Sequence, residues 1–247
     1  MDGTTAYLAA WRLTADASPV VTPTSEVTFV RTRDGSPAVL KIARLPEEQR
    51  GNALMAWWPG EASAHVLAHI GPAVLLERAA GPRSLSELAA RDDDAATRVL
   101  AETARRLHAR PDGKVRAMPL RRWFRDLIDT PDKRFTDARA TALRLFDDPR
   151  DEVVLHGDIH HDNVLDFGDD DAPLWKAIDP KGLVGESGFD YANLLCNPPG
   201  TFAANHEPAR LERRAAVVAS VTGLPAARVR DWHRAWHALS ALWAAQS

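Results

Sequence analysis

Apolar and β-branched residues dominate two segments near the start of the chain and predict a β-hairpin. Residues 26–33 are rich in valine and threonine, Asp34-Gly35 is a strong hairpin turn, and residues 38–42 form a second apolar run. Two shorter apolar runs, which we interpret as further strands, follow at 64–67 and 73–78. The first third of the chain is therefore predicted to be mainly β-structure.

A helix interrupts these strands, and a change of pattern follows them. Pro46 opens the predicted helix, which runs to Trp58 and is stopped by Pro59-Gly60. Further along, Gly81-Pro82 breaks the strand pattern. We interpret this second break as a hinge between two lobes.

Beyond the hinge, apolar residues recur at three- and four-residue spacing, which predicts helices. They are expected at 84–90, 95–110, 120–128 and 137–146, and again in the last part of the chain. A short extended island, with predicted strands at 153–155 and 175–178, interrupts the helices. We therefore predict an α+β fold with an N-terminal lobe over residues 1–79 and a mainly helical C-terminal lobe over residues 80–247.

The last predicted helix carries a stripe of large apolar residues. Trp232, Trp236, Leu239 and Trp243 share one face of this helix. Such a stripe either packs into a core or lines a substrate pocket. The core is the commoner place for large apolar side chains, so we favour it here.

Composition narrows the setting of the protein without identifying a function. The 247 residues are 45% hydrophobic and 26% charged, with a net charge of -3, which is ordinary for a globular protein. Lysine and arginine are spread along the chain, so neither nucleic acid nor a membrane is expected as a partner. Cys196 is the only cysteine, and the start of the chain lacks a signal-peptide pattern. We expect a cytoplasmic protein, and the pattern indicates no oligomeric state.

The segment after the predicted strand at 153–155 carries the clearest chemistry. His156, Asp158 and Asn163 fit the spacing H-x-D-x-x-x-x-N of a kinase catalytic loop. A loop of this length can turn back so that one carboxylate meets an attacking hydroxyl group while an amide oxygen reaches a metal ion. We therefore expect Asp158 to be the catalytic base, and His156 to orient the loop through its backbone.

A second metal ligand is expected beyond this loop. Asp179 lies sixteen residues after Asn163, at the end of the predicted strand at 175–178. Magnesium prefers hard oxygen donors and usually takes few of them from protein, the rest coming from phosphate and water. Asn163 and Asp179 together would supply such a pair.

The predicted strand at 38–42 supplies a candidate phosphate-binding cation. It reads Ala38-Val39-Leu40-Lys41, which is similar to the V-A-I-K strand whose lysine pairs with the α- and β-phosphates of a nucleotide. Such a lysine needs a carboxylate from the following helix. Glu48 is our choice for this partner, with Glu47 next to it.

Each of these residues, taken alone, has an ordinary structural interpretation. The residues around Asp158, taken together, also allow a different chemistry. A single Asp or Asn in a loop is usually a cap or turn residue. A zinc or two-metal hydrolase centre is a competing hypothesis, for which the candidate ligands are His156, Asp158, His160, His161 and Asp162. That alternative leaves Lys41 and Asp179 without roles, so the order and spacing favour the kinase.

These motifs resemble the aminoglycoside phosphotransferase superfamily, and more closely its streptomycin 6-phosphotransferase and hydroxyurea phosphotransferase branch. The D-P-K-G form at Asp179 is the most branch-specific part of the resemblance. The matching segments are 22–25, 51–58, 75–79, 156–158, 178–186 and 188–193.

The resemblance implies a bilobal protein-kinase-like fold with a mostly antiparallel N-terminal sheet and ATP in the cleft. It implies that adenine bonds to hinge backbone between Glu77 and Ala79, and that Asn163 and Asp179 hold Mg²⁺. By the same resemblance, Asp190 braces the catalytic loop and Lys181 reaches phosphate or substrate.

The sequence departs from the kinase pattern at the expected phosphate loop. No glycine-rich loop precedes the strand at 38–42, and Pro23-Thr24-Ser25 occupies that place. We expect hydroxyl groups and backbone amides of this segment to cover the phosphates instead.

The acceptor is left open by these motifs, because fold resemblance does not identify a substrate. A small cationic acceptor such as streptomycin is favoured by the branch, and we expect carboxylates to meet its guanidinium groups. Asp162, Glu186 and Glu207 are the acids considered for this. The alternatives are hydroxyurea, a different small metabolite, or a nucleotide-binding module without catalysis.

Overall fold

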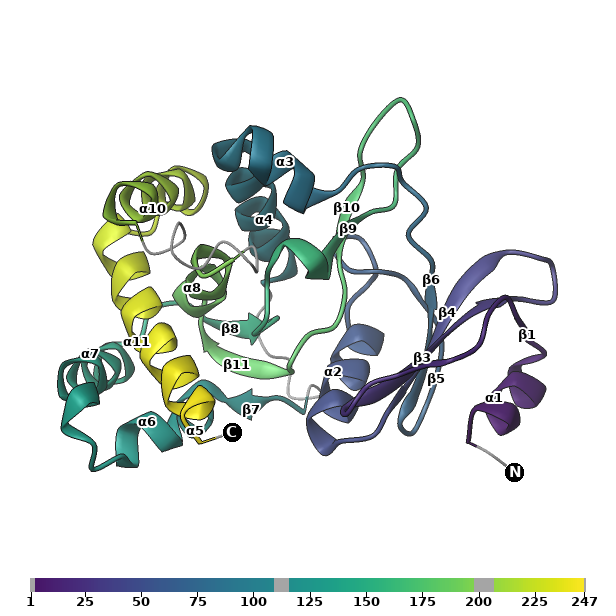
Figure 1. The fold of residues 1–247 in the computed structure, drawn as a ribbon, viewed down its shortest axis with the longest axis horizontal. Coiled ribbons are helices and arrows are strands. Elements are labelled where there is room, and N and C mark those ends of the chain that lie inside the picture. The colour runs from purple at the N-terminus through teal and green to yellow at the C-terminus, as the bar shows by residue number, and fades with distance from the viewer. Residues whose placement is uncertain (1–2, 109–115, 198–206, 247) are drawn as a thin grey trace.

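A six-stranded antiparallel sheet forms the N-terminal part of the protein (Figure 1). The computed structural model describes residues 3–108, 116–197 and 207–246. Along the sheet the order is β1-β3-β4-β6-β5, and β2 pairs with β3. The strands are β1 (Thr14–Ala15), β2 (Val20–Val21), β3 (Ser25–Arg31), β4 (Pro37–Ala43), β5 (Val66–Ile70) and β6 (Ala73–Glu77). The predicted hairpin and the predicted strand at 73–78 are confirmed, whereas the strand predicted at 64–67 lies further along, at Val66–Ile70.

Side chains alternate between the two faces of this sheet, and a helix covers each face. One face carries Leu40 and Leu75, against which α1 (Gly3–Trp11) packs. Val74 and Leu76 point to the opposite face, which is covered by α2 (Pro46–Trp57), the predicted helix. Helix α1 and strands β1 and β2 were not predicted from the sequence. These elements are short, and neighbours in the sheet stabilise them more than their own sequences do.

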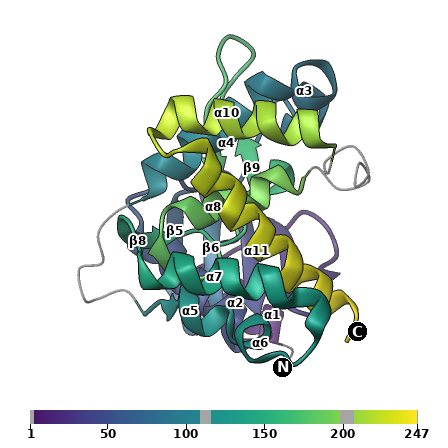
Figure 2. The same ribbon diagram turned by 90° about the vertical axis from the view of Figure 1, so that its left-hand side faces the viewer.

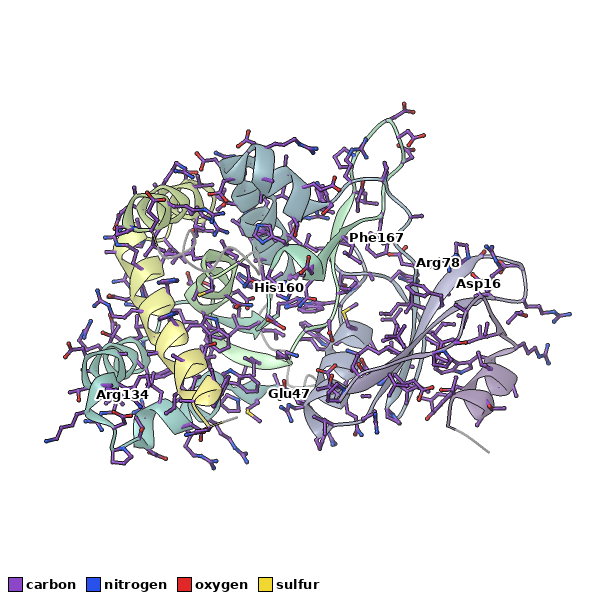
Figure 3. All side chains as sticks on the ribbon, viewed as in Figure 1. Asp16, Glu47, Arg78, Arg134, His160 and Phe167 are labelled. Atoms are coloured by element: carbon purple, nitrogen blue, oxygen red, sulfur yellow. The ribbon has the colours of Figure 1, made fainter. Side chains whose placement is uncertain are left out.

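The chain leaves the sheet after β6. Arg78 Nη1 lies 2.9 Å from Asp16 Oδ2, which ties the end of β6 to the segment after β1 (Figure 3). A few residues later, the backbone N–H of Gly81 donates to the Asp166 carbonyl (3.0 Å). The division into lobes at residues 79 and 80 stays a prediction.

The second half of the chain is mainly helical, as predicted. Ser84 and Asp92 cap two of the helices by accepting backbone N–H groups of Glu87 and Ala95. The predicted 120–128 helix is two short helices, and residues 109–110 of the predicted 95–110 helix lie outside the described residues. The helices are α3 (Leu85–Arg91), α4 (Asp93–Leu107), α5 (Leu120–Trp123), α6 (Arg125–Asp129), α7 (Thr136–Asp147), α8 (Gly188–Leu195), α10 (Pro208–Thr222) and α11 (Ala226–Ala244).

Two small sheets hold the segments that carry the predicted chemistry. One is the antiparallel pair β9 (Val164–Asp166) and β10 (Trp175–Ala177). The other joins β7 (Met118–Pro119), β11 (Leu183–Glu186) and β8 (Glu152–Leu155). β11 was not predicted from the sequence, and only helices were expected in that part of the chain. Four residues carry little local signal, and their pairing with β8 makes them a strand.

The last helix, α11, packs across α8 and α7 in the helical part (Figure 2). Trp232 is fully buried there, in edge-to-face contact with Phe124, Phe146 and Phe189. No helix among the described residues is long and apolar enough to cross a membrane.

Candidate active site

The predicted catalytic loop runs from β8 to β9 and is ordered by its own histidine. His156 Nδ1 accepts the backbone N–H of Asp158 (3.1 Å), and Nε2 donates to the Ile178 carbonyl (2.8 Å). Burial lowers the pKa of His156, so the ring stays neutral with its proton on Nε2. Gly157 has a φ of +83°, a left-handed conformation that suits glycine at this turn. These contacts support the orienting role expected for His156.

A buried carboxylate on α8 holds the same loop from behind. Asp190 Oδ1 accepts the N–H of Gly157 (2.7 Å), and its Oδ2 accepts the N–H of His156 (3.0 Å). His108, which the sequence analysis did not single out, lies with Nε2 2.9 Å from the same Oδ2. The position of Asp190 agrees with the brace that the resemblance implied.

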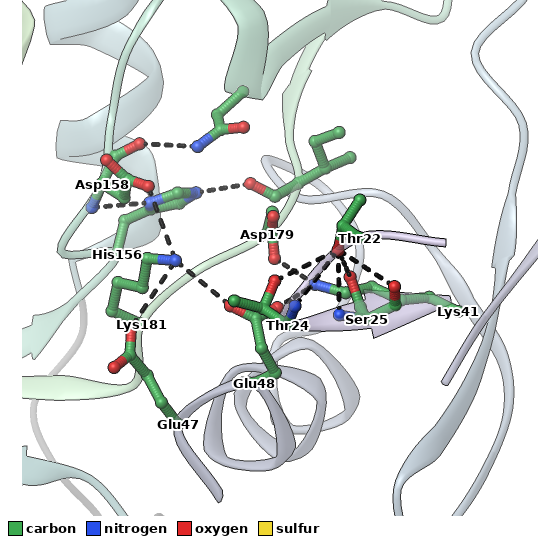
Figure 4. A network of polar contacts seen from close by, with 12 residues as sticks. Thr22, Thr24, Ser25, Lys41, Glu47, Glu48, His156, Asp158, Asp179 and Lys181 are labelled. Carbon is green, nitrogen blue, oxygen red and sulfur yellow. Dashed lines mark hydrogen bonds and ion pairs between the residues drawn. The ribbon is translucent and has the colours of Figure 1, made fainter. Parts of the chain in front are cut away.

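Lys41 projects from β4 between two carboxylates (Figure 4). Its Nζ lies 2.5 Å from Glu48 Oε2, and it also contacts Oδ1 of Asp179. Glu47, one residue earlier on α2, lies 3.6 Å from Lys181. The structure therefore pairs Lys41 with Glu48, the residue chosen from the sequence.

The two residues expected to bind magnesium lie side by side at the ends of β9 and β10. The N–H of Ile178 donates to the Asn163 carbonyl (2.9 Å), so Asp179 follows immediately beyond this link. Asn163 Nδ2 donates to the carbonyl of Asp158 (2.9 Å), which directs the amide oxygen away from that carbonyl. Burial would raise the pKa of Asp179, but the ammonium of Lys41 holds it below its ordinary value. Asp179 is therefore an anionic oxygen donor at neutral pH.

The side chains of Lys41, Glu48 and Asp179 form a charged group, and Lys181 connects it to Asp158. Its Nζ lies 3.2 Å from Glu48 Oε1 and 3.7 Å from Asp158 Oδ2. Burial would lower the pKa of Lys181, but the carboxylates of Asp158, Glu48 and Asp179 raise it instead. The side chain is therefore a full cation beside the proposed base.

A glycine inside α2 permits this convergence. A Cβ at Gly51 would lie 2.1 Å from the carbonyl oxygen of Pro180, which follows Asp179. Any larger residue would push α2 away from the segment that carries Asp179 and Lys181. The absence of a side chain at Gly51 therefore lets Glu48 reach both lysines.

The segment that replaces a glycine-rich loop forms a closed turn between β2 and β3. Thr22 Oγ1 accepts the backbone N–H groups of Thr24 (3.3 Å) and Ser25 (3.0 Å). This turn lies next to Lys41 in Figure 4. Because Thr22 occupies both amides, these groups could cover phosphates only after exchanging that partner.

The expected hinge lies at and beyond the end of β6. Glu77 donates its backbone N–H to the His65 carbonyl (3.0 Å), and its carboxylate lies 2.6 Å from Lys176. Ala79 follows the strand and is half-buried. Adenine binding at this segment stays a prediction, and the N–H of Glu77 already has a partner.

A cavity of about 610 Å³ opens beside Asp158 on the side of the helical part. Its walls come from α2, the α5–α6 region and α11. The lining residues are Glu47, Met118, Arg122, Trp123, Arg125, Asp126, Asp158, Lys181, Trp236 and Trp243. We refer to it as the acceptor cavity.

The tryptophan stripe serves both purposes weighed from the sequence. Trp232 and Leu239 are buried in the core, as favoured. Trp236 and Trp243 are half-buried, so they pack against the same core on one side and line the acceptor cavity on the other. Helical periodicity places residues on one face but does not say where the covering elements end.

The acids expected to meet a cationic acceptor do not line this cavity. Glu186 is buried and paired with Arg228 (2.6 Å), and Glu207 is exposed at the start of α10. Asp162 accepts a hydrogen bond from Ser86 (3.2 Å). The acceptor cavity has Glu47, Asp126 and Asp158 in their place. Sequence position alone did not distinguish these acids, because α5 and α6 approach the loop only in the folded chain.

The zinc alternative finds no support in the geometry. The described residues contain no group of three or more His, Cys, Asp or Glu side chains placed to hold one metal ion. His161 is buried in the loop, and its two ring nitrogens have no hydrogen-bond partner. Burial lowers its pKa to about 3, so the ring is neutral and part of the packing.

Known proteins resemble this chain over nearly its whole length. Residues 10–247 match the family described as aminoglycoside/hydroxyurea antibiotic resistance kinase. A streptomycin 3''-kinase from Klebsiella pneumoniae is 43% identical over 241 residues, which cover 94% of this chain and 89% of that protein. A streptomycin 6-kinase from Streptomyces glaucescens is 33% identical over 249 residues, which cover 94% of this chain and 79% of that protein.

Solved structures show the same fold at much lower identity. The aminoglycoside phosphotransferase APH(3'')-Id from Streptomyces rimosus superposes with a TM-score of 0.61 at 19% identity, covering 97% of this chain and 99% of that one. The same enzyme in complex with ADP and streptomycin gives a TM-score of 0.60. The predicted kinase-like α+β fold is confirmed.

Proposed function

Because this chain belongs to the aminoglycoside/hydroxyurea antibiotic resistance kinase family, we propose that it transfers the γ-phosphoryl group of ATP to a hydroxyl group of streptomycin. The single observation that carries this proposal is the position of Asp158. Its carboxylate lines the acceptor cavity and also approaches Lys181, which belongs to the charged group around Lys41. A base at such a junction can reach an acceptor hydroxyl group while the phosphates lie on its other side.

The base would act by accepting one proton. As the acceptor oxygen attacks the γ-phosphorus, its O–H proton passes to a carboxylate oxygen of Asp158, and the bond to the bridging oxygen of ADP breaks. Lys181 lies close enough to Asp158 and Glu48 to neutralise charge on this path. Catalysis is then positioning and electrostatic stabilisation rather than covalent chemistry of the protein.

Lys41 is proposed to pair with the α- and β-phosphates, and Glu48 to orient it. The short contact between Lys41 and Glu48 supports this assignment, since Glu48 is buried and remains beside the lysine. Asp179 also contacts Lys41 and would be released when phosphates take that place. Lys181 is proposed to contact the transferred phosphoryl group. The backbone between Glu77 and Ala79 is proposed to bind adenine.

The donors near Asp179 fit magnesium. Asn163 offers an amide oxygen and Asp179 a carboxylate oxygen, from the neighbouring ends of β9 and β10. Magnesium usually takes such a small set of hard oxygen donors from protein. When bound, Mg²⁺ would neutralise negative charge on the nucleotide phosphates. Asp190 and His156 keep the loop in the conformation that presents Asn163.

The acceptor cavity supports a cationic substrate. Aromatic faces of Trp123, Trp236 and Trp243 attract guanidinium groups, and Asp126 adds a carboxylate at their edge. Arg122 and Arg125 also line the cavity, so its charge is mixed and the tryptophans carry much of the expected selectivity.

Two hydroxyl groups of streptomycin are the candidate sites of transfer. We favour the 3''-hydroxyl, because identity to the 3''-kinase is 43% against 33% for the 6-kinase. The sequence motifs themselves left the hydroxyl group open. Phosphorus–proton correlation NMR of the purified product distinguishes the two positions.

A coupled assay of ADP release with Mg·ATP tests the function directly. We expect turnover with streptomycin well above ATP hydrolysis without acceptor. Asp158→Ala is the matched control for contaminating kinases. Turnover of hydroxyurea or a neutral polyol but not streptomycin would overturn the acceptor assignment and keep the kinase. Nucleotide binding without turnover of any acceptor would support a non-catalytic module.

A further inference from the structure

A chain of two hydrogen bonds connects the wall of the acceptor cavity to the proposed base. Trp236 Nε1 on α11 donates to Asn193 Oδ1 (2.9 Å), and Asn193 Nδ2 on α8 donates to Asp158 Oδ1 (2.7 Å). Asn193 is buried, whereas Trp236 lines the cavity. None of the motifs in the sequence assigned a role to Asn193.

The direction of this chain follows from the chemistry of its ends. An indole N–H only donates, and an ionised carboxylate only accepts. Asn193 lies between them and can satisfy both only with its oxygen toward Trp236 and its NH₂ group toward Asp158. The indole of Trp236 therefore excludes the flipped amide, which would turn an oxygen toward the carboxylate.

The consequence is that the two oxygens of Asp158 are made different. Oδ1 is held by Asn193, and the bond to an ionised oxygen is among the stronger kinds of hydrogen bond. Oδ2 lies 3.7 Å from Lys181 Nζ, on the side of the charged group. Holding one oxygen in place fixes the direction in which the other points.

We propose that Asn193 and Trp236 are positioning residues that orient the carboxylate of Asp158, so that Oδ2 receives the acceptor proton. This inference rests on the proposed kinase function. Trp236 touches the cavity as well, so a substrate that packs on its ring also steadies the hydrogen bond that orients the base.

Neighbouring rings hold the indole of Trp236 in place. Its ring meets Phe189 edge-to-face at 5.5 Å between centroids and Trp243 at 5.9 Å. Phenylalanine at position 236 would keep an aromatic ring in this packing, while it removes the N–H donor together with part of the bicyclic ring. Trp236→Phe is therefore a conservative test of the hydrogen bond itself.

The experiment is a double-mutant cycle in the streptomycin assay. We expect Trp236→Phe to lower kcat about fivefold and to leave the KM for ATP within twofold of wild type. Because the ring also lines the cavity, the KM for streptomycin should rise as well, so kcat is the parameter that reports the hydrogen bond. Asn193→Ala should lower kcat more, on the order of tenfold to a hundredfold. Because Trp236 acts through Asn193, adding Trp236→Phe to Asn193→Ala should cause no further loss.

Trp243→Phe is the matched control. The indole of Trp243 lines the same cavity, but its N–H donates to Asp126 (2.9 Å) instead of Asn193. This variant should raise KM for streptomycin and add its effect independently in the Asn193→Ala background. Thermal unfolding of each variant reports whether a loss is merely structural.

Three outcomes would overturn the proposal. They are wild-type kcat in Trp236→Phe, a change confined to KM as in Trp243→Phe, and additive losses in the double variant. Trp236→Phe alone decides the matter if Asn193→Ala does not fold. Failure of wild-type protein to phosphorylate any acceptor would instead reject the kinase function, which the same assay shows before any variant is made.

Discussion

The two sides of the catalytic loop differ in the chemistry of their side chains. Toward the sheet, Lys41, Glu48, Asp179 and Lys181 form one network of full charges. Toward α11, Asp158 meets the neutral amide of Asn193 and a wall of tryptophans. The charges of the sheet side pair with one another, whereas the helical side presents a cavity.

This difference indicates how each side can respond to its ligand. On the sheet side, Lys41 contacts two carboxylates. Phosphates can therefore bind Lys41 only by displacing one of these carboxylates. On the helical side, apolar faces and fixed hydrogen bonds are preorganised and require little exchange. Substitutions on the sheet side should therefore affect nucleotide binding, and those on the helical side should affect acceptor binding or the orientation of the base.

The largest effect is expected at the junction of the two sides. Asp158→Ala should lower kcat by at least two to three orders of magnitude, the usual size for loss of a positioned base, while ATP affinity changes little. Steady-state kinetics with calorimetry of nucleotide binding checks both parts. A variant that keeps more than about a tenth of wild-type kcat would assign the base elsewhere.

On the sheet side, Asp179→Ala should abolish the magnesium-dependent part of nucleotide binding. Asn163 alone is a neutral, weaker ligand for a hard dication. Calorimetry with ATP, with and without Mg²⁺, measures this dependence. Unchanged affinity with normal metal dependence would remove Asp179 from the site.

Lys41→Ala should both raise KM for ATP and lower kcat, each on the order of tenfold, because a phosphate-binding cation stabilises ground and transition states alike. Glu48→Gln should act in the same way but more weakly. Glu47 contacts Lys181 and not Lys41 in the structure, so Glu47→Gln is its matched control. A damaging Glu47→Gln beside a silent Glu48→Gln would contradict the pairing.

On the helical side, Asp126→Asn should raise KM for streptomycin about twofold to fivefold and leave KM for ATP unchanged. Asp126 is exposed, and exposed ion pairs contribute little. Such charges are screened within about 8 Å at physiological ionic strength, so kcat/KM for streptomycin should fall as salt rises. A salt response of the same size in Asp126→Asn would exclude this carboxylate as its source.

The last effect is on stability rather than on kinetics and concerns the loop between the two sides, where His161 is buried and neutral. Its pKa is lowered to about 3 from 6.5, so the unfolded chain binds more protons between these values. The contribution of neutral His161 to the free energy of unfolding is fully present above pH 6.5. This contribution is lost as the pH falls, by up to about 1.4 kcal/mol per pH unit. His161→Phe should remove this contribution, so wild type should lose stability relative to the variant between pH 7 and 5.

Denaturant unfolding at pH 8, 7, 6 and 5 measures the difference. The two proteins should show a constant stability difference above pH 7 and a changing one below it. Parallel pH profiles throughout would show that His161 takes up protons equally in the folded and unfolded chain.

The sequence alone was enough to identify the strands β3, β4 and β6, helix α2 and the loop between β8 and β9, whereas the catalytic role of that loop stays a prediction. These features have local causes, which are the β-branched runs, the Asp34-Gly35 turn, Pro46 and the spacing from His156 to Asn163. The pairing of Lys41 with Glu48 was also predictable, because both residues lie within one strand–helix unit.

The tertiary structure alone decided which residues complete the site. Asn193 on α8 reaches Asp158, and Trp236 on α11 reaches Asn193. Asp126 and Trp123 come from a third region of the chain. In the sequence, Asn193 looks like any amide near the end of a helix. Trp123 and Trp236 look like tryptophans of a hydrophobic core. Their roles follow from which helices pack together, which is a sum of many weak contacts between segments far apart in the sequence.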